Sequence, residues 1–272
     1  MSEFMETIGL IAGNGRFPIL FARAAKEQNI QVVAAGIKGD TAWHLKFFVS
    51  ELRWFQVGQL AALFQYFLSQ GVRRVIMAGQ VHPRNLFDTT VNLDGEFQDL
   101  FRALQDRKAD TIFSAVADKL HQQGLELLDS TFLLKKYLAP RGTLTRRGPT
   151  LLELDDIAFG KQIAKTMGGL DIGQTVVIKN KAIVAIEAME GTDRCIVRGG
   201  GIAQQGAVVV KMSKPEQDFR FDVPVVGPQT VRHMARVRAG CLAIEAGKTI
   251  LIDPLKTMAL ANKAAICIVS TP

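Results

Sequence analysis

The stretch Thr7–Ala12 (TIGLIA), followed by Gly13–Pro18 (GNGRFP), decides the fold of this chain. The first six residues form a nearly continuous apolar run, which is typical of a strand covered by helices on both faces of a parallel sheet. Glycines directly after such a strand let backbone N–H groups approach a phosphate, and the N-terminus of a following helix adds positive potential. Pro18 suits the first helical turn, where its missing N–H costs nothing. This opening therefore predicts a strand, a glycine loop and a helix.

The same alternation continues through the first half of the chain. Two more apolar runs read as strands, and three stretches place apolar residues at helical spacing ahead of a further short strand. Strand–helix alternation of this kind favours a Rossmann-like, doubly wound parallel sheet in an α/β domain over residues 1–137. The predicted strands are Gln31–Ile37, Val72–Ala78 and Leu125–Leu128, and the predicted helices are Pro18–Asn29, Gln59–Gln70 and Asp110–Gln123.

A change in composition separates this half from the next. Ala139–Thr150 (APRGTLTRRGPT) is rich in Pro, Gly and Arg, which predicts a linker at 138–150. Asp155 or Asp156 is expected to cap a helix at Ile157–Met167, because an Asp side chain accepts from the N–H groups of a first turn. Residues 151–272 are expected to form a second, mixed α/β domain. Its predicted hairpin is Gln174–Lys179 with Ala182–Ala188, its other strands are Ala207–Met212, Thr249–Ile252 and Ala265–Val269, and its second helix is Gln229–Ala239.

Composition excludes several classes of protein. The 272 residues are 48% apolar, and the mean hydropathy of +0.14 argues against disorder and low-complexity scaffolds. No apolar stretch is long enough for a transmembrane helix and Met1–Thr7 shows no secretory signal, so we expect a cytoplasmic protein. A net charge of +7 indicates an anionic partner, and the scarcity of Trp and Tyr speaks against nucleic acid. The three cysteines are expected to be small buried side chains: Cys195, Cys241 and Cys267.

The loop after the third predicted strand is a candidate binding segment. Ligands of open α/β sheets bind beyond the carboxyl ends of the strands, so Gly79–Arg84 is expected to face the same crevice as Gly13–Gly15. His82 or Arg84 is then placed to contact a sugar or phosphate, although Pro83 equally suits an ordinary surface turn. A dinucleotide fingerprint needs a third glycine where this chain has Pro18, so a nucleotide-dependent oxidoreductase remains only an alternative, with Asp40 as its ribose-binding acid.

Three segments of the second half are dense in charge. Glu187–Asp193 ends a strand with carboxylates and a glycine, Lys211–Asp218 follows another strand, and Arg220–Pro224 leads toward a helix start. Carboxylates beside lysines and arginines supply what phosphoryl chemistry needs, namely cations for oxyanions, a base and oxygen ligands for Mg²⁺. A charged turn that simply meets solvent explains each segment taken singly.

Together these segments resemble the LpxI-type UDP-2,3-diacylglucosamine pyrophosphatases of lipid A biosynthesis. The resemblance runs from about Ile8 to Val269, and its last run is the most specific. It is carried by Gly13–Pro18, Leu138–Thr145 (LAPRGTLT), Asp171–Gln174 (DIGQ), Glu187–Asp193 and Lys214–Pro224 (KPEQDFRFDVP).

The resemblance implies a two-domain enzyme that holds its substrate between a Rossmann-like domain and a distinct C-terminal domain. Such enzymes hydrolyse the pyrophosphate of UDP-2,3-diacylglucosamine to UMP and 2,3-diacylglucosamine 1-phosphate (lipid X). Water attacks the α-phosphorus, and Mg²⁺ or another divalent cation is required. Peripheral contact with the inner face of the inner membrane and assembly into a homodimer are compatible with this reading. A non-catalytic nucleotide-sugar or lipid binding protein is a further alternative, because residues alone do not establish turnover.

The resemblance also implies roles for individual residues. Asp222 is the first match for the family's essential acid and Asp218 is its rival; either is a candidate metal ligand, and the acid either binds Mg²⁺ or deprotonates the water. Lys214 is expected to stabilise charge on the phosphate oxygens. Trp43–Phe48 is a candidate wall for the acyl chains or a lipid contact, with ordinary core packing as the alternative. The remaining substrate-binding candidates are Gly13, Asn14, Gly15, Gly79, Gln80 (often Lys in the family), Thr192, Asp193 and Arg220.

Overall fold

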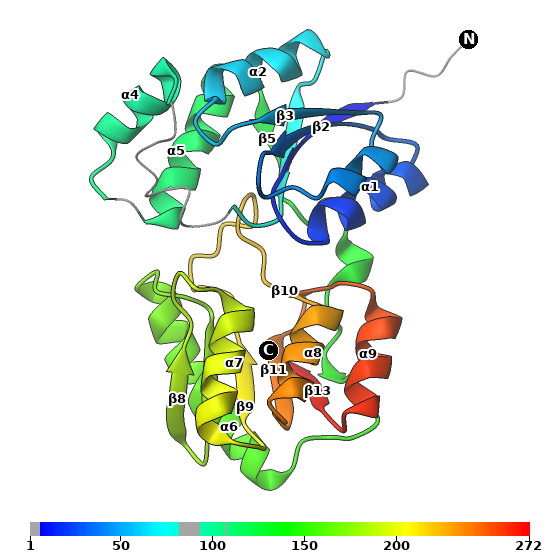
Figure 1. Ribbon diagram of the computed structural model, residues 1–272, viewed down its shortest axis with the longest axis vertical. Helices are drawn as coiled ribbons and strands as arrows, with labels where there is room; N and C mark the ends of the chain where they lie inside the picture. The colour runs from blue at the N-terminus through cyan, green and yellow to red at the C-terminus, as the bar shows by residue number, and fades with distance from the viewer. Residues whose placement is uncertain (1–5, 82–92, 107) are drawn as a thin grey trace. The chain divides into compact units, whose positions relative to one another are not determined.

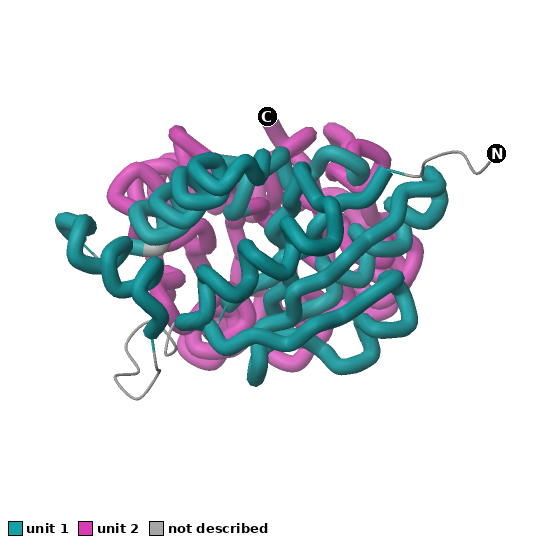
Figure 2. Tube along the Cα trace, turned by 90° about the horizontal axis from the view of Figure 1, so that it is seen from above, with its two compact units in different colours: residues 1–134, 218–222 teal, residues 135–217, 223–272 magenta. Residues whose placement is uncertain are grey.

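The computed structural model describes residues 6–81, 93–106 and 108–272, and these residues divide into two compact units (Figures 1 and 2). Unit 1 comprises residues 1–134 together with Asp218–Asp222, which we call the return segment. Unit 2 comprises residues 135–217 and 223–272. The chain therefore leaves unit 2 briefly to complete unit 1 before it finishes unit 2.

Unit 1 contains a parallel sheet in the order β3-β2-β1-β4-β5. β1 pairs with β2 on one side and with β4 on the other, so the strand order reverses between β1 and β4. Apolar runs form β1, β2 and β4 because these strands lie inside the sheet, whereas β3 (ELRWF) is an edge strand with mixed polarity that the sequence did not predict. The strands are β1 (Thr7–Ala12), β2 (Gln31–Ile37), β3 (Glu51–Phe55), β4 (Arg74–Ala78) and β5 (Glu126–Leu127).

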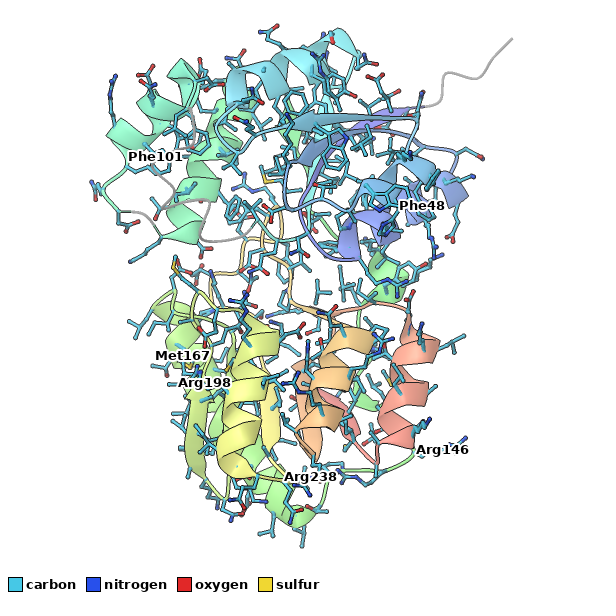
Figure 3. The ribbon with its side chains drawn as sticks, in the orientation of Figure 1. Phe48, Phe101, Arg146, Met167, Arg198 and Arg238 are labelled. Carbon is cyan, nitrogen blue, oxygen red and sulfur yellow. The ribbon has the colours of Figure 1, made fainter. Side chains whose placement is uncertain are left out.

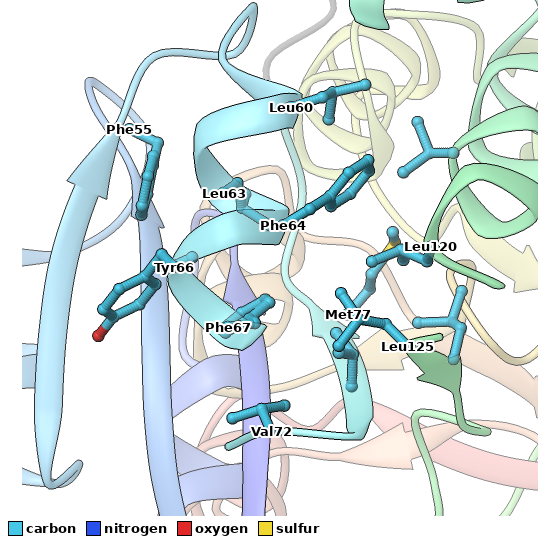
Figure 4. Close-up of a cluster of buried hydrophobic side chains, with 14 of the residues drawn as sticks. Phe55, Leu60, Leu63, Phe64, Tyr66, Phe67, Val72, Met77, Leu120 and Leu125 are labelled. Atoms are coloured by element: carbon cyan, nitrogen blue, oxygen red, sulfur yellow. The ribbon is translucent and has the colours of Figure 1, made fainter. Parts of the chain in front are cut away.

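Helices complete unit 1 around this sheet (Figure 1). Figure 4 shows part of the core between α2 and the sheet, where Phe64 and Phe67 are almost fully buried near Leu120. Each such side chain contributes on the order of 2 kcal/mol when it leaves water. The helices are α1 (Phe17–Glu27), α2 (Leu60–Ser69), α4 (Gly95–Ala103) and α5 (Ala109–Gln122), with a short 3₁₀ turn, η1 (Trp43–Phe47), before β3.

Unit 2 is built on a mixed sheet in the order β6-β13-β11-β9-β7-β8, which agrees with the mixed α/β composition predicted for the second half. Three central strands are parallel, and β6, β7 and β8 run antiparallel to their neighbours. The strands are β6 (Gly142–Thr143), β7 (Thr175–Lys179), β8 (Ala182–Ile186), β9 (Val208–Lys211), β11 (Cys241–Glu245) and β13 (Cys267–Thr271). A separate parallel pair consists of β10 (Val225–Val226) and β12 (Ile250–Leu251).

Helices cover this sheet in an asymmetric way. α6 (Leu151–Gly169) packs on one face, where Met167 near its end joins the core (Figure 3). The other face carries α7 (Thr192–Ala203), α8 (Pro228–Arg236) and α9 (Pro254–Lys263). Each of these three helices precedes one of the parallel strands β9, β11 and β13. Their N-termini therefore lie at the edge where those strands end, which we call the carboxyl edge of unit 2. A 3₁₀ turn, η2 (Lys135–Tyr137), opens the unit.

The prediction for the start of α6 was wrong. The helix begins at Leu151, and Thr150 caps it in a capping box in which the Thr150 hydroxyl accepts from the Glu153 N–H. Asp156 has a different task, because its carboxylate accepts the N–H groups of Asn180 and Lys181 at 3.0 and 2.6 Å in the β7–β8 turn. A sequence signal for the true cap, Thr followed by Glu three positions later, was present.

Glycines explain why α7 was not predicted. Gly199 and Gly200 lower helix propensity, yet both serve close packing. A Cβ on Gly199 would lie 2.7 Å from Val177 of β7, and any side chain on Gly200 would collide with Val237 just after α8. The missing side chains therefore let α7 approach the sheet and its neighbouring helix.

Within the described residues no helix is both long and apolar enough to span a membrane. All three cysteines are free and buried, as predicted.

Candidate functional site

Two loops meet at the carboxyl edge of unit 1, where the strand order reverses. The Gly13 N–H donates to the Ala78 carbonyl at 2.8 Å. Asn14 and Gln80 exchange backbone hydrogen bonds of 2.8 and 3.3 Å, so the loop after β1 and the loop after β4 are joined. The structure thus brings together five predicted residues: Gly13, Asn14, Gly15, Gly79 and Gln80.

Only glycine fits at the centre of this junction. Gly79 has φ +90°, and a Cβ there would overlap the Asn14 carbonyl oxygen. A Cβ on Gly13 would lie 2.7 Å from the Gln80 carbonyl oxygen. These glycines are therefore required for backbone to pack directly on backbone.

The junction also limits which backbone N–H groups could bind a phosphate. The N–H groups of Gly13 and Asn14 already have carbonyl acceptors inside unit 1, so they are not the donors that the sequence suggested. Gly15, at φ +88°, and the first turn of α1 follow directly in the chain. A phosphate at this edge would meet Gly15 and the positive end of the helix.

The return segment brings both candidate acids to unit 1. The Ser130 N–H, just beyond β5, donates to the Phe219 carbonyl at 2.8 Å. β5 runs parallel to β4, so this contact lies at the same carboxyl edge as the glycine junction. Asp218 and Asp222 are therefore carried by the unit that holds the glycine loops, although their sequence positions lie within the second half.

Asp218, one of the two candidate acids, forms an ion pair within the return segment. Both carboxylate oxygens of Asp218 accept from the Arg220 side chain, at 2.6 to 3.1 Å, and one oxygen also accepts the Arg220 N–H at 3.0 Å. The Arg220 guanidinium holds the pKa of Asp218 below its ordinary value. Arg220, predicted to bind substrate, is thereby part of a local ion pair. The Asp222 N–H donates to the Asp218 carbonyl at 3.0 Å, which closes a turn.

The carboxyl edge of unit 2 is built from buried charged side chains. Lys211, at the end of β9, is 7% exposed and donates to the Thr192 hydroxyl at 2.8 Å. Thr192, the first residue of α7, donates in turn to Glu187 at 2.9 Å. Asp193 lies in the first turn of the same helix, with its carboxylate 3.3 Å from His233 Nδ1. The structure thus groups Thr192 and Asp193, as predicted, and adds Lys211 and Glu187 as their neighbours.

Lys214 is held in place rather than projecting into solvent. Its Nζ is 2.5 Å from an Asp171 carboxylate oxygen, and its backbone N–H donates to the Gln217 side chain at 2.8 Å. The Lys214 side chain is 8% exposed and that of Asp171 16%. The sequence motifs containing Asp171 and Lys214 therefore meet in space.

A buried carboxylate that sequence analysis missed organises the same edge. Glu245, at the end of β11, accepts from Lys165 of α6 at 2.8 Å and from the Ser213 hydroxyl and N–H at 2.6 and 2.9 Å. Lys248 is a third partner at 3.0 Å. Burial opposes ionisation of Glu245, but hydrogen bonds from Lys165, Ser213 and Lys248 outweigh it and lower its pKa to about 2. Glu245 is therefore a fixed anion held by Lys165, Ser213 and Lys248.

Some predicted contacts fall elsewhere. His82, Pro83 and Arg84 lie outside the described residues. In the part of the chain that the structure describes, no three His, Cys, Asp or Glu residues gather in a way that would hold a metal ion by themselves. The Trp43–Phe48 segment divides: Leu45 is buried in the core, whereas Trp43 and Phe47 are 63% and 66% exposed.

Comparison with known proteins agrees with the two-part architecture. Residues 7–137 match the family model of the LpxI N-terminal domain, and residues 140–269 match that of the LpxI C-terminal domain. The chain belongs to the LpxI family. A curated relative, "UDP-2,3-diacylglucosamine pyrophosphatase LpxI" of Caulobacter vibrioides, is 27% identical over 281 residues, which cover 95% of each chain.

Two solved structures of other enzymes are only distantly similar to this chain. The biotin carboxylase domain of Hydrogenobacter thermophilus 2-oxoglutarate carboxylase gives a TM-score of 0.29 at 14% identity over 74% of this chain. The ADP complex of N5-carboxyaminoimidazole ribonucleotide synthetase gives 0.27 at 15% identity over 65%. The matches span 42% and 34% of those proteins' lengths. Such TM-scores carry no argument about this LpxI-family chain.

Proposed function

We propose that this LpxI-family chain hydrolyses the pyrophosphate bond of UDP-2,3-diacylglucosamine to give UMP and 2,3-diacylglucosamine 1-phosphate (lipid X). The observation that carries the proposal is the alignment with the Caulobacter relative of that name, which runs through 95% of both chains. The matches to both LpxI domain models support it, because they include the glycine junction of unit 1 and the charged edge of unit 2.

In this proposal residues 1–137 form a Rossmann-like domain, 138–150 a linker and 151–272 the C-terminal domain. The glycine junction, with Gly13, Asn14, Gly15, Gly79 and Gln80, contacts the nucleotide and its diphosphate. It is supported by its position where the strand order reverses, since ligands of open parallel sheets bind at such points. Gly15 and the first turn of α1 would meet the negative charge.

Asp222 is the proposed essential acid, which either binds Mg²⁺ or orients and deprotonates the water attacking the α-phosphorus. Its rival, Asp218, has both carboxylate oxygens engaged by Arg220, which supports a structural role for that pair. A general base must be able to contact the proton that it removes. The Asp218 carboxylate already accepts hydrogen bonds from the Arg220 guanidinium on both oxygens, so it is poorly suited to that task.

The side chains of unit 2 are proposed to bind the phosphorylated lipid. Thr192 and Asp193 stand at the N-terminus of α7, and Lys214, three residues after the end of β9, is proposed to supply positive charge. Lys211 reinforces this role because its buried ammonium directly contacts Thr192. Cations and helix N-termini stabilise phosphate oxygens in the ground state and as charge develops.

Mg²⁺ is the proposed cofactor. This ion commonly binds through one or two carboxylates completed by phosphate oxygens and water. The described residues fit that pattern rather than a complete protein cage, since they form no group of three acidic, His or Cys ligands. Asp222 would hold the ion, with Asp218 as a second ligand if Arg220 releases it. When bound, the ion neutralises charge on the diphosphate.

A product assay tests the proposal. Full-length protein is incubated with UDP-2,3-diacylglucosamine and Mg²⁺, and nucleotide products are separated by chromatography. We expect UMP and lipid X in equal amounts, and loss of both on adding EDTA. Tight binding of the substrate without release of UMP would instead indicate a binding protein, and reduction of a nicotinamide cofactor would indicate an oxidoreductase.

We also propose that the protein acts from the cytoplasm on lipid at the inner face of the inner membrane, through the exposed aromatic pair Trp43 and Phe47. Lys46 lies 5.3 and 5.1 Å from the two ring centroids, so the pair combines apolar surface with positive charge. This combination suits the boundary between acyl chains and anionic headgroups. Leu45, which is buried between them, anchors the turn.

Vesicle sedimentation tests this contact. The wild type is expected to sediment with vesicles containing phosphatidylglycerol, and Trp43→Ala with Phe47→Ala to reduce the bound fraction several-fold. Leu255→Ala is a matched control, because Leu255 is 90% exposed on unit 2. Equal binding of all three proteins would contradict the assignment. The predicted homodimer is tested separately by light scattering on the full chain.

A further inference from the structure

Ser130 lies in the loop after β5 and is fully buried. A buried hydroxyl has to find hydrogen-bond partners, so its contacts indicate what it does. The Ser130 Oγ is 2.6 Å from the carbonyl oxygen of Met77 in β4 and 2.7 Å from that of Arg220 in the return segment. The Ser130 N–H donates to the neighbouring carbonyl of Phe219 at 2.8 Å.

One residue thus joins a central strand to two consecutive carbonyls of the return segment. The hydroxyl has a single proton to share between Met77 and Arg220, while the backbone N–H holds Phe219 independently. Ser130 and Arg220 are 90 positions apart in the sequence. Chain connectivity alone therefore does not fix the return segment to β4, and Ser130 supplies the link.

A second contact holds the far side of the segment. The ring of Phe221 stacks on Phe113 of α5, with centroids 5.6 Å apart and planes inclined by 24°. Arg220 is thus held through its backbone carbonyl by Ser130, and Phe221 is held through its ring by Phe113. Asp222 is the next residue. The turn that ends on the Asp222 N–H leaves the Asp222 carboxylate attached to an immobilised support.

We propose that Ser130 is a positioning residue for the hydrolysis: it fixes the return segment on the carboxyl edge of unit 1 and thereby sets the place of the Asp222 carboxylate. This inference rests on the function proposed above. It assigns the acid to the unit that carries the glycine junction, so a movement of unit 2 leaves the spacing between acid and junction unchanged. Ser130 itself transfers no proton.

Ser130→Ala tests the proposal, because it removes the hydroxyl and keeps the N–H bond to Phe219. A displacement of a catalytic group by about 1 Å can cost on the order of a hundredfold in rate. We expect kcat to fall tenfold to a hundredfold with KM within about twofold of the wild type. Ser50→Ala is the matched control, since the Ser50 hydroxyl also donates to a main-chain carbonyl of unit 1, that of Val32, at 2.6 Å. It should keep the wild-type kcat.

The double variant separates positioning from general support of the fold. If Ser130 acts through Asp222, Ser130→Ala adds no further loss of kcat in an Asp222→Ala background. An additive loss, or a wild-type kcat in Ser130→Ala alone, would overturn the inference. Ser130→Cys has a weaker donor of similar size and should give an intermediate kcat. If the alanine variant does not fold, the same measurements are made on Ser130→Cys instead.

Amide hydrogen exchange gives a readout independent of turnover. Ser130→Ala should speed exchange of the Asp222 N–H, whereas Ser50→Ala should leave it unchanged. If the wild type releases no UMP, the proposed function fails. Faster exchange of the Asp222 N–H in Ser130→Ala would still show that Ser130 holds the return segment. If the wild type is active and exchange at Asp222 is unaffected, the positioning role fails on its own.

Discussion

The carboxyl edges of the two units are formed by different chemical groups. In unit 1 the edge is mostly backbone, with glycines that let the loops after β1 and β4 bond to each other and a segment held through its carbonyls. In unit 2 the edge consists of buried charged side chains, namely Lys211, Lys214, Glu187 and Glu245. A backbone edge provides close approach, whereas the unit 2 edge provides buried charged groups of both signs, held in place by hydrogen bonds and ion pairs.

The largest effect is expected at Asp222, the proposed catalytic acid in the return segment of unit 1. Asp222→Ala should lower kcat by about 10² to 10⁴, the usual contribution of a positioned base, with KM changed only a few-fold. Asp218→Asn, the comparison variant, weakens the pair with Arg220 and should retain far more activity. Steady-state release of UMP measures both. The reverse ranking of the two variants would transfer the catalytic role to Asp218.

A smaller effect, on stability, is expected in the unit 2 edge. Glu245 has its pKa lowered from 4.5 to about 2, so its ionised form favours the folded state by about 3 kcal/mol. This contribution is complete above the unfolded pKa and is lost as pH falls from about 4.5 toward 2. Glu245→Gln should therefore unfold at lower urea than the wild type at pH 7.

The difference between the two proteins should shrink as the pH falls to 3 and below. Urea unfolding at a series of pH values measures it. A constant difference across that range would show that Glu245 does not titrate with the shifted pKa, and the account of the charged edge would need revision.

The glycine junction should show a loss of about 2 to 3 kcal/mol. Gly79→Ala combines positive φ with overlap against the Asn14 carbonyl, and strained positions of this kind cost about 1–3 kcal/mol each. Gly39 has a similar φ of +86°, but a Cβ built there would have no neighbour within 4 Å, so Gly39→Ala measures the cost of the backbone conformation alone. Thermal unfolding should rank Gly79→Ala below Gly39→Ala. Equal losses would mean that the loops do not pack as closely as described.

The smallest effect contrasts two adjacent acids of α6. Asp155 pairs with Lys181 on the surface, with side chains about 60% exposed, and Asp155→Asn should change stability by less than about 0.5 kcal/mol. Asp156, which is 4% exposed and accepts two backbone N–H groups, should cost about 1–3 kcal/mol when replaced by Ala. Urea unfolding of both variants gives the comparison, and similar values would argue against the role given to Asp156.

Sequence reasoning succeeded where local pattern determines structure. The strands at Thr7–Ala12 and Gln31–Ile37 were predicted with their observed bounds, because burial on both faces leaves a continuous apolar run. The Asn180–Lys181 turn was also predicted, since two residues between strands suit a tight hairpin, and both adopt positive φ. The parallel sheet of the first half was predicted from such elements, whereas for the second half the sequence predicted only a mixed α/β composition.

Sequence reasoning failed where contacts between distant residues decide. α7 was missed because its glycines lower helix propensity, while the reason for them is close packing against Val177 and Val237. Glu245 was missed because it ends an apolar strand, and its partner Lys165 is 80 positions away. The candidate acids were named from their motif, but their attachment to unit 1 depends on Ser130, which no local pattern marks.

The most direct test of the central claim is hydrolysis in H₂¹⁸O. The purified chain is incubated with UDP-2,3-diacylglucosamine and Mg²⁺, and both products are examined by mass spectrometry, with Asp222→Ala as the matched protein. The account predicts one ¹⁸O in the phosphate of UMP, none in lipid X, and a greatly reduced yield from the variant. Label in the phosphate of lipid X, or undiminished labelling of UMP by Asp222→Ala, would contradict it.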